Sequence, residues 1–260
     1  DKIINEGYTV LENCIDSNLI SKINLSINNK FQSLLPSKSK KSNDITKNFL
    51  ELLKSKKQFE IQKILSKHLI DCGLVDEIFN SKNLKDELIG LLGPDLTYMT
   101  DFEMAINSSA INQKDSYLIK KYHQEFWSGM GLESLQLWIP IKIKNSEGSM
   151  EIIKNSHRWG HIPNQNREPV KLPKKYETVK LEIDEGSVAV LTALTLHRTS
   201  KINSKDIRIA LPITVRNFYY PNTNNSDIFH FKKINNSFFT KLRKILGNKN
   251  YSPFRTEKNL

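Results

Sequence analysis

The sequence has little of what secreted or membrane-spanning proteins need. Only two cysteines, Cys14 and Cys72, occur among 260 residues, too few for a disulfide framework, so we expect a reducing, cytoplasmic location. No apolar run approaches the roughly 20 residues of a transmembrane helix, and no signal-peptide pattern opens the chain. The first residue is not Met, so we expect further residues to precede Asp1 in the native chain.

Arginine is also scarce, although the chain is strongly basic. Only seven of the 39 basic residues are Arg, the formal net charge is +11, and the lysines are dispersed along the chain. Surfaces that read nucleic-acid bases rely on Arg and on interleaved aromatic side chains, and such a stripe is missing. The sequence therefore predicts a solvated lysine surface and no specific nucleic-acid partner. The competing hypothesis, action on nucleic acid, requires a concentrated basic groove with stacking aromatics.

Helical periodicity dominates the first part of the chain and strand periodicity the second. Apolar residues recur at helical spacing after Asp16, which is typical of an N-cap, and again over 45–92 with breaks near Gly73 and 80–81. A loop is expected between these two helical regions, over 36–44. Alternating or apolar runs predict strands at 7–11, 96–106, 116–125, 134–143, 149–154, 178–183, 187–191 and 207–219.

This order of elements predicts a mainly β fold with α. We expect a double-stranded β-helix, the jelly-roll or cupin-like barrel, with the N-terminal helices packed on one side. The length suits a single domain over 1–260. It divides into a mainly helical support region (1–94), a jelly-roll core (95–220) and a C-terminal extension with a helix (221–260).

Two histidines and one acid form the most informative pattern. His123 and Glu125 lie two apart in an expected strand, so their side chains would face the same way while Gln124 points away. His197 would add a second imidazole from a distant segment. Two nitrogens and one oxygen on one side of a metal are the facial set of non-haem Fe(II) oxygenases. The alternative is a surface triplet and a hydrogen-bonded core histidine.

Arg208 lies in the otherwise apolar stretch 207–211. A guanidinium is rarely buried without an anionic partner, and its planar fork matches a carboxylate. Arg208 is therefore predicted to hold the distal carboxylate of 2-oxoglutarate, with a structural ion pair as the alternative. Thr199 or Thr214 would add a hydroxyl to the same carboxylate, and the sequence does not choose between them.

Three further side chains are expected near the same pocket. Gln136 and Trp138 share one face of their strand, opposite a face of leucine and isoleucine. If the apolar face packs outward on the helices, Gln136 contacts cosubstrate or substrate from within the barrel. A structural polar residue is the equal alternative. Trp127, beside the first metal motif, is expected in the pocket wall.

The connection over 155–177 is long enough for a functional lid. It carries four groups that can be cationic, namely His157, Arg158, His161 and Arg167. Near the pocket mouth they predict an anionic substrate, in whose binding His157 and Arg158 take part. A solvated loop explains the same residues.

The tail carries a basic amphipathic segment. Its members are Phe238, Phe239, Leu242, Ile245 and Leu246 together with Lys241, Arg243 and Lys244. We expect this helix to dock against the barrel. Peripheral contact with a membrane surface is the alternative.

Taken in order, these motifs resemble the phytanoyl-CoA dioxygenase family of Fe(II)/2-oxoglutarate oxygenases. The matching segments, spread over roughly 4–220, are 7–11, His123-Gln124-Glu125-Phe126-Trp127, 137–141, 148–157, His197 and Arg208. The resemblance implies Fe(II) bound by His123, Glu125 and His197, with 2-oxoglutarate and dioxygen as cosubstrates. It implies hydroxylation of a C–H bond with release of succinate and CO2, without specifying the substrate. With the cationic groups of the connection, we expect a small, anionic metabolite or a lipid- or sugar-linked precursor.

Two departures from the family pattern bear on the reaction. Glu125 stands where Asp is usual, and a longer carboxylate still binds iron. Halogenating relatives have Gly or Ala at this place, so Glu125 favours hydroxylation. Asn155 stands where Gly is usual before Ser-His, which implies a shifted turn. Oxidative demethylation or desaturation on the same scaffold stays open, as does a non-catalytic cupin-like binding protein, which predicts a missing ligand.

Overall fold

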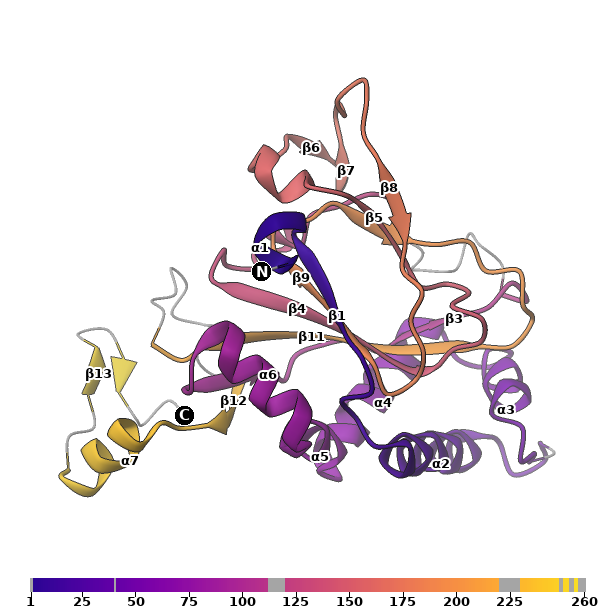
Figure 1. Ribbon diagram of the computed structural model, residues 1–260. Coiled ribbons are helices and arrows are strands. Elements are labelled where there is room, and N and C mark those ends of the chain that lie inside the picture. Colours follow the sequence, from indigo (N-terminus) through magenta and orange to yellow (C-terminus); the bar gives the residue numbers. More distant parts are fainter. Residues whose placement is uncertain are drawn as a thin grey trace.

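Two antiparallel sheets form the barrel of this chain (Figure 1). The computed structural model describes residues 2–39, 41–111, 120–219, 230–247, 250–252 and 255–256. In the larger sheet the strand order is β1 (Tyr8–Leu11), β9 (Val188–Thr192), β4 (Ser134–Lys142), β11 (Arg208–Asn217), β2 (Leu96–Met99) and β12 (Phe231–Asn235), with β3 (Ala105–Asn107) also paired to β11. The smaller sheet has the order β10 (His197–Thr199), β5 (Met150–Ile153) and β8 (Thr178–Lys180). The jelly-roll prediction is confirmed.

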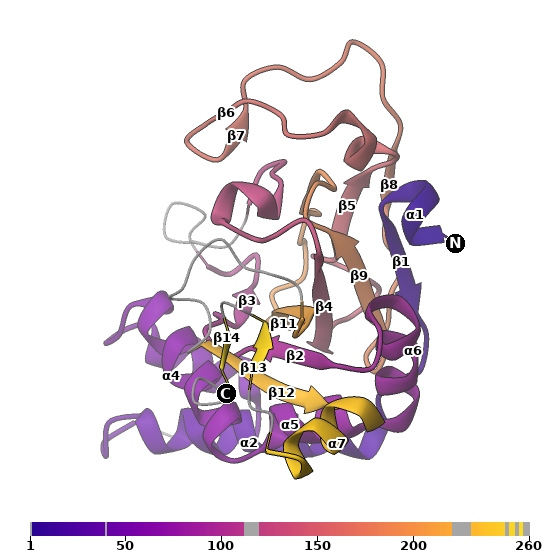
Figure 2. The ribbon, with the colours of Figure 1, turned by 90° about the vertical axis from the view of Figure 1, so that its left-hand side faces the viewer.

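Five helices cover the outer face of the larger sheet (Figure 1, Figure 2). They are α2 (Ser17–Leu34), α3 (Ile45–Leu52), α4 (Gln58–Asp71), α5 (Leu74–Asn80) and α6 (Lys82–Leu92). As predicted, the Asp16 side chain caps α2 by accepting from the Asn18 amide, 2.7 Å away. Two shorter helices, α1 (Lys2–Glu6) and α7 (Phe238–Ile245), lie near the two ends of the chain. Among the described helices, each is too short or too polar to cross a membrane.

Strand β4 separates two cores because its side chains alternate between the faces of the sheet. Leu137 and Ile139 belong to the core shared with the helices, where they meet buried residues such as Phe31 of α2. Trp138 points to the opposite side and packs inside the barrel, next to Leu191. The leucine face therefore does pack outward, and residues of even number on β4 face the barrel interior.

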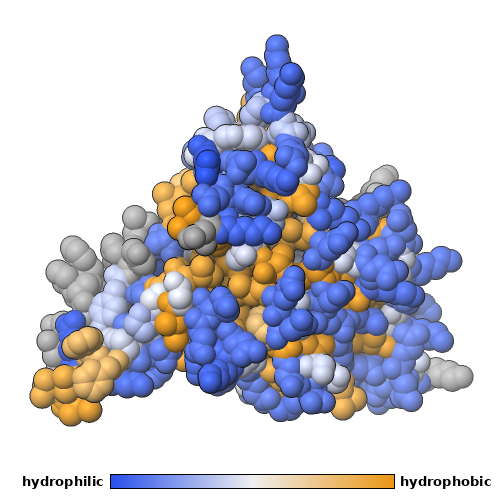
Figure 3. Space-filling model, viewed as in Figure 1, coloured by the Kyte–Doolittle hydropathy of each residue, from blue (hydrophilic) through white to orange (hydrophobic). Residues whose placement is uncertain are grey.

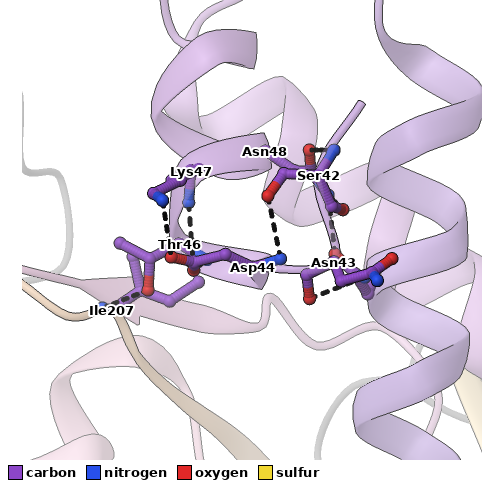
Figure 4. A network of polar contacts seen from close by, with 8 residues as sticks. Ser42, Asn43, Asp44, Thr46, Lys47, Asn48 and Ile207 are labelled. Atoms are coloured by element: carbon purple, nitrogen blue, oxygen red, sulfur yellow. Dashed lines mark hydrogen bonds and ion pairs between the residues drawn. The ribbon is translucent and has the colours of Figure 1, made fainter. Parts of the chain in front are cut away.

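A polar network joins the helical layer to the start of β11 (Figure 4). The Asp44 carboxylate caps α3 by accepting from the amides of Thr46 and Lys47. The Thr46 hydroxyl in turn accepts from the Ile207 amide, 3.3 Å away, and Asn48 donates to Ser42 O. The network therefore fixes the backbone directly before Arg208 against the first turn of α3.

Two strand predictions need correction. The expected strand over 96–106 is two strands, β2 and β3. Over 116–125, residues 112–119 lie outside the described part, and 120–125 is not a regular strand. The backbone turns there into a 3-10 helix, Glu125–Ser128, in which the Trp127 amide bonds to Gln124 O while the Phe126 amide bonds to Ala193 O. The sequence also missed β10 and β12.

The predicted long connection between β5 and β8 is present. It contains a 3-10 turn, Ser156–Trp159, and a small hairpin formed by β6 (Asn164–Gln165) and β7 (Glu168–Pro169). Farther on, β13 (Asn250–Ser252) pairs with β14 (Arg255–Thr256).

Candidate metal centre and cleft

The two predicted histidines meet at the edge of the smaller sheet. His123 and His197 form an isolated antiparallel bridge, in which each backbone amide donates to the other carbonyl over 3.0 and 3.1 Å. Their ring centroids lie 4.2 Å apart. Residues far apart in the sequence are thus fixed side by side by main-chain bonds, which hold whether or not their side chains have a ligand.

The Glu125 carboxylate points at both imidazoles. Its Oε1 lies 3.2 Å from His123 Nε2 and 3.5 Å from His197 Nε2. One ligand atom from each of the three residues lies within 4.8 Å of the other two, a spacing that a single metal ion can bridge. Although 120–125 is not the strand expected, the 3-10 turn still brings the carboxylate to the histidines.

Backbone carbonyls set the tautomer of both rings. His123 Nδ1 lies 2.8 Å from Lys121 O, and His197 Nδ1 lies 3.0 Å from Thr195 O. A carbonyl only accepts, so each Nδ1 carries the proton and donates it. In the neutral imidazole the Nε2 lone pair is then free to bind a cation, as in most protein metal sites.

The charge states of His123 and Glu125 also suit a cation. Burial, with the neighbouring His197, lowers the pKa of His123 to about 4, so this ring is neutral at pH 7. Burial alone would raise the pKa of Glu125, but the positive charge of Lys120 and the two adjacent imidazoles hold it well below its usual value. Two bare nitrogens and one carboxylate therefore converge, and this donor set fits Fe(II).

Gln124 holds the motif from behind. Its side chain is fully buried; Nε2 donates to Gly160 O over 2.9 Å and to Leu194 O over 2.7 Å. Its Oε1 accepts from the Ile162 amide over 3.1 Å. Gln124 points away from the metal ligands, as predicted. Three of the four hydrogen bonds that its side-chain amide can form go to the main chain. It fixes the residues on either side of it.

A cleft of about 760 Å³ opens at the three ligand residues. Two predicted side chains, Trp127 and Gln136, line it, and Gln136 Oε1 accepts from the Thr214 hydroxyl over 3.0 Å. Sequence reasoning missed a further set of lining residues, which are Met99, Ser134, Pro212, Arg216 and Phe231. Most of these lie on inward-facing positions of β2, β4 and β11, so the alternation of side chains along each strand could have predicted them.

Arg216 is the most unexpected of these residues. It is buried, lies on the same face of β11 as Arg208, and its guanidinium carbon is 3.6 Å from the centroid of the Phe231 ring. The aromatic ring thus covers the guanidinium plane, an arrangement that favours a charged side chain. Phe231 belongs to β12, which was not predicted from the sequence, so its contact with Arg216 was not predicted either.

Arg208 is buried and is not part of the cleft lining. Its Nη1 donates to Ala105 O over 3.3 Å, and its guanidinium carbon is 5.4 Å from the Trp138 ring. Burial lowers the pKa of Arg208 to about 10, so the side chain stays charged at neutral pH. Gly148 makes room for it, because a Cβ there would come within 3.3 Å of Arg208 Nε and within 2.7 Å of the Ile202 side chain.

Strand β10 leads from the metal centre towards Arg208. His197 pairs with Ile152 and Thr199 with Met150 in its neighbour β5. The next bond joins the Ser200 amide to Ser149 O, directly beside Gly148. Thr199 therefore lies between His197 and the surroundings of Arg208, whereas the Thr214 hydroxyl is bound to Gln136.

Three predicted substrate contacts are not part of the cleft lining: Trp138, which packs inside the barrel, His157 and Arg158. His157 Nε2 lies 3.0 Å from Ile4 O, and the ring packs so closely on Gly7 that a Cβ there would come within 2.5 Å. Arg158 is exposed to solvent. The long connection instead contributes Arg167, from the β6–β7 turn, to the cleft lining. His157 and Arg158 lie outside the cleft lining because the start of the chain holds this turn.

Comparison with known proteins settles the family. The family model for phytanoyl-CoA dioxygenase (PhyH) matches residues 4–210, most of the chain. The chain belongs to the phytanoyl-CoA dioxygenase family. The match runs through His123, Glu125, His197 and Arg208, and it confirms the enzyme class that the sequence predicted, the non-haem Fe/2-oxoglutarate oxygenase type. A search of curated protein sequences gives no significant match.

Solved structures agree with this fold. The non-heme monooxygenase ThoJ in its apo form is 13% identical, with a TM-score of 0.62 over 91% of this chain and 83% of that chain. The ThoJ–Ni complex is 12% identical, with a TM-score of 0.57 over 92% and 84%. The epimerase SnoN in complex with Fe3+, alpha ketoglutarate and nogalamycin RO is 14% identical, with a TM-score of 0.51 over 83% and 81%. At such identities the likeness establishes the fold alone.

Proposed function

We propose that this member of the family is an Fe(II)/2-oxoglutarate-dependent dioxygenase. It hydroxylates a C–H bond of a small anionic metabolite, or of a lipid- or sugar-linked precursor, and releases succinate and CO2. The observation that carries the proposal is the convergence of two imidazoles, each with Nδ1 bound to a carbonyl, on one carboxylate oxygen. Three acceptors so close together repel one another unless a proton or a cation lies between them.

In this proposal His123, Glu125 and His197 hold the iron. The bound iron, with 2-oxoglutarate and dioxygen, supplies the oxidising chemistry, and the chain supplies position and a water-poor surrounding. Glu125 provides the carboxylate that a halide would replace in a halogenating enzyme, which supports hydroxylation. The non-catalytic alternative predicts a lost ligand, and it loses support because all three ligands converge.

The cosubstrate is proposed to lie along β10. Arg208 binds its distal carboxylate, and Thr199 adds a hydroxyl from the strand between the metal centre and Gly148. Support comes from the buried cation itself, which faces the barrel interior beside Trp138. Thr214 becomes the weaker candidate, since its hydroxyl donates to Gln136. Gln136 then contacts the cosubstrate or substrate from the cleft wall.

The substrate is proposed to carry an anionic group that binds near Arg216. This side chain is buried, charged and part of the cleft lining, and Arg167 lines the same cleft. Two lysines line it as well: Lys121 Nζ lies 2.8 Å from Glu168 and Lys120 Nζ lies 3.6 Å from Glu125. Trp127 supplies an aromatic wall for the apolar part of the substrate.

Three coarser expectations accompany this function. We propose that 1–94, 95–220 and 221–260 form one domain, because strands from all three regions join the larger sheet. The cytoplasmic location stays a prediction from the two cysteines, both of which are free. Oxidative demethylation and desaturation use the same site, and product analysis separates them from hydroxylation.

Succinate formation tests the proposal directly. The protein is loaded with Fe(II) under argon, mixed with 2-oxoglutarate and metabolite pools in air, and assayed for succinate. We expect iron-dependent succinate release that His197→Ala abolishes. His68→Ala is the matched control, because His68 lies on α4 and contacts Ser26 instead of the cleft. Equal succinate release by His197→Ala and the unaltered protein would refute the proposed function.

A further inference from the structure

The C-terminal helix α7 turns its apolar side chains to solvent. The exposed fractions are 71% for Phe238, 74% for Phe239, 38% for Leu242, 80% for Ile245 and 74% for Leu246. In the space-filling view they form an apolar cluster that projects from the molecule at the lower left, where Figure 1 draws α7 (Figure 3). The expected docking of these side chains on the barrel is therefore wrong.

The helix is nevertheless held in place by its polar residues. The Ser237 hydroxyl caps α7 by accepting from the Thr240 amide over 3.1 Å, and the Ser237 amide donates to the Asp95 carboxylate over 2.8 Å. Thr240, the buried residue of the helix, also shares a 2.6 Å hydrogen bond with the Tyr219 hydroxyl. Because the polar side of α7 is bonded to the body of the protein, the apolar side has to face outward.

Basic residues surround this apolar face. The helix carries Lys241, Arg243 and Lys244 and has no acidic residue, and the exposed Lys233 lies on β12 just before it. Phe238, Leu242 and Ile245 follow helical spacing and so lie along one side. An apolar stripe flanked by Lys and Arg is the pattern of helices that lie in the plane of a membrane surface.

We propose that α7 docks on an anionic lipid surface, with its phenylalanine, leucine and isoleucine side chains inserted between the headgroups. Charge decides between the two simplest occupants. In a symmetric pair of chains the same basic patch would face itself, and each chain carries a net charge of +11. Anionic headgroups attract the same lysines and arginine, while the apolar side chains leave water. The proposal does not depend on the proposed enzymatic function.

Strand β12 connects the cleft to α7. Its first residue, Phe231, lines the cleft beside Arg216, and α7 begins seven residues later at Phe238.

Co-sedimentation with lipid vesicles tests the proposal. The full chain is mixed with vesicles of phosphatidylcholine alone, or of phosphatidylcholine with phosphatidylglycerol, at low and at physiological salt. We expect binding to the anionic vesicles that weakens as salt is added. Phe239→Glu with Ile245→Glu should weaken it at least about tenfold, and Lys241→Glu should weaken it about fivefold or more.

Leu25→Glu is the matched control, because Leu25 is also an exposed apolar residue (61%) but lies on α2, a different helix. Its vesicle binding should equal that of the unaltered chain. Circular dichroism and thermal unfolding check that each variant is folded. Absent binding to anionic vesicles, or equal binding by the double variant, would overturn the proposal. So would self-association in sedimentation velocity that the double variant abolishes, since a second copy would then be the occupant.

Discussion

Replacing Gln124 with Leu should destabilise the protein more than a change at any ordinary polar residue. Gln124 is fully buried, and its amide makes three hydrogen bonds to the main chain, at Gly160, Leu194 and Ile162. Leucine has a similar size but can form none of them. Two carbonyls and one amide would then be left without their partner, and each such group costs about 1–3 kcal/mol. After relaxation, we expect a loss of at least about 3 kcal/mol in the free energy of unfolding.

Urea unfolding of the metal-free protein at pH 7 measures this loss. Gln32→Leu is the matched control, because Gln32 is half-buried and its amide donates one hydrogen bond, to Ser42 O. The control should cost about 1 kcal/mol or less. Since Gln124 lies between two proposed ligands, Gln124→Leu should also weaken Fe(II) binding, whereas Gln32→Leu should not. A loss for Gln124→Leu no larger than for the control would refute the positioning role.

Three other predictions concern the charged and crowded parts of the barrel. Gly148→Ala should raise the 2-oxoglutarate concentration needed for half-maximal succinate release. It should also cost about 1–2 kcal/mol of stability, because Gly148 has φ +71 and no room for a Cβ. Unchanged values of both would contradict this prediction. Arg208→Gln should raise this half-maximal 2-oxoglutarate concentration at least tenfold, which corresponds to about 1.4 kcal/mol, while the Kd for Fe(II) stays within about threefold. A larger loss of iron affinity would argue for a structural role of Arg208. The pKa of His123 falls from 6.5 in the unfolded chain to about 4 in the folded one, so the unfolded state binds the proton first as the pH drops. The stability of the metal-free protein should therefore fall between about pH 6.5 and about pH 4. His123→Gln should flatten that slope in urea unfolding curves, and an unchanged slope would refute the assignment.

Part of the candidate metal centre could be predicted from a local pattern, whereas His197 was assigned from the order of the motifs that resemble the family. His123 and Glu125 lie two apart, and the residue types specify the ion whatever the backbone between them does. The backbone itself was predicted wrongly there, as a strand, and the convergence survived because a 3-10 turn brings the carboxylate to the same place. Trp127 was predicted because it lies beside the first metal motif, and Gln136 because side chains alternate along a strand. Both signals are local.

The remainder of the site depends on contacts between distant segments. His157 was expected at the cleft, but the chain's first turn, around Ile4 and Gly7, holds its ring. Arg216 was overlooked because the ring that covers it comes from β12, a short strand with little apolar pattern. The outward face of α7 likewise follows from hydrogen bonds to Asp95 and Tyr219, which no local pattern reveals. Contacts of this kind between distant segments cannot be predicted from the spacing of residue types along the chain.

X-ray absorption spectroscopy of the Fe(II)-loaded protein tests the central claim most directly. We predict one Fe(II) per chain with scattering from two imidazole rings, and one imidazole fewer in His197→Ala. In Glu125→Ala the two imidazoles should remain while the affinity for iron falls. Failure to bind one Fe(II) per chain, or an imidazole signal that His123→Ala and His197→Ala both leave unchanged, would contradict the metal centre on which the proposed reaction depends.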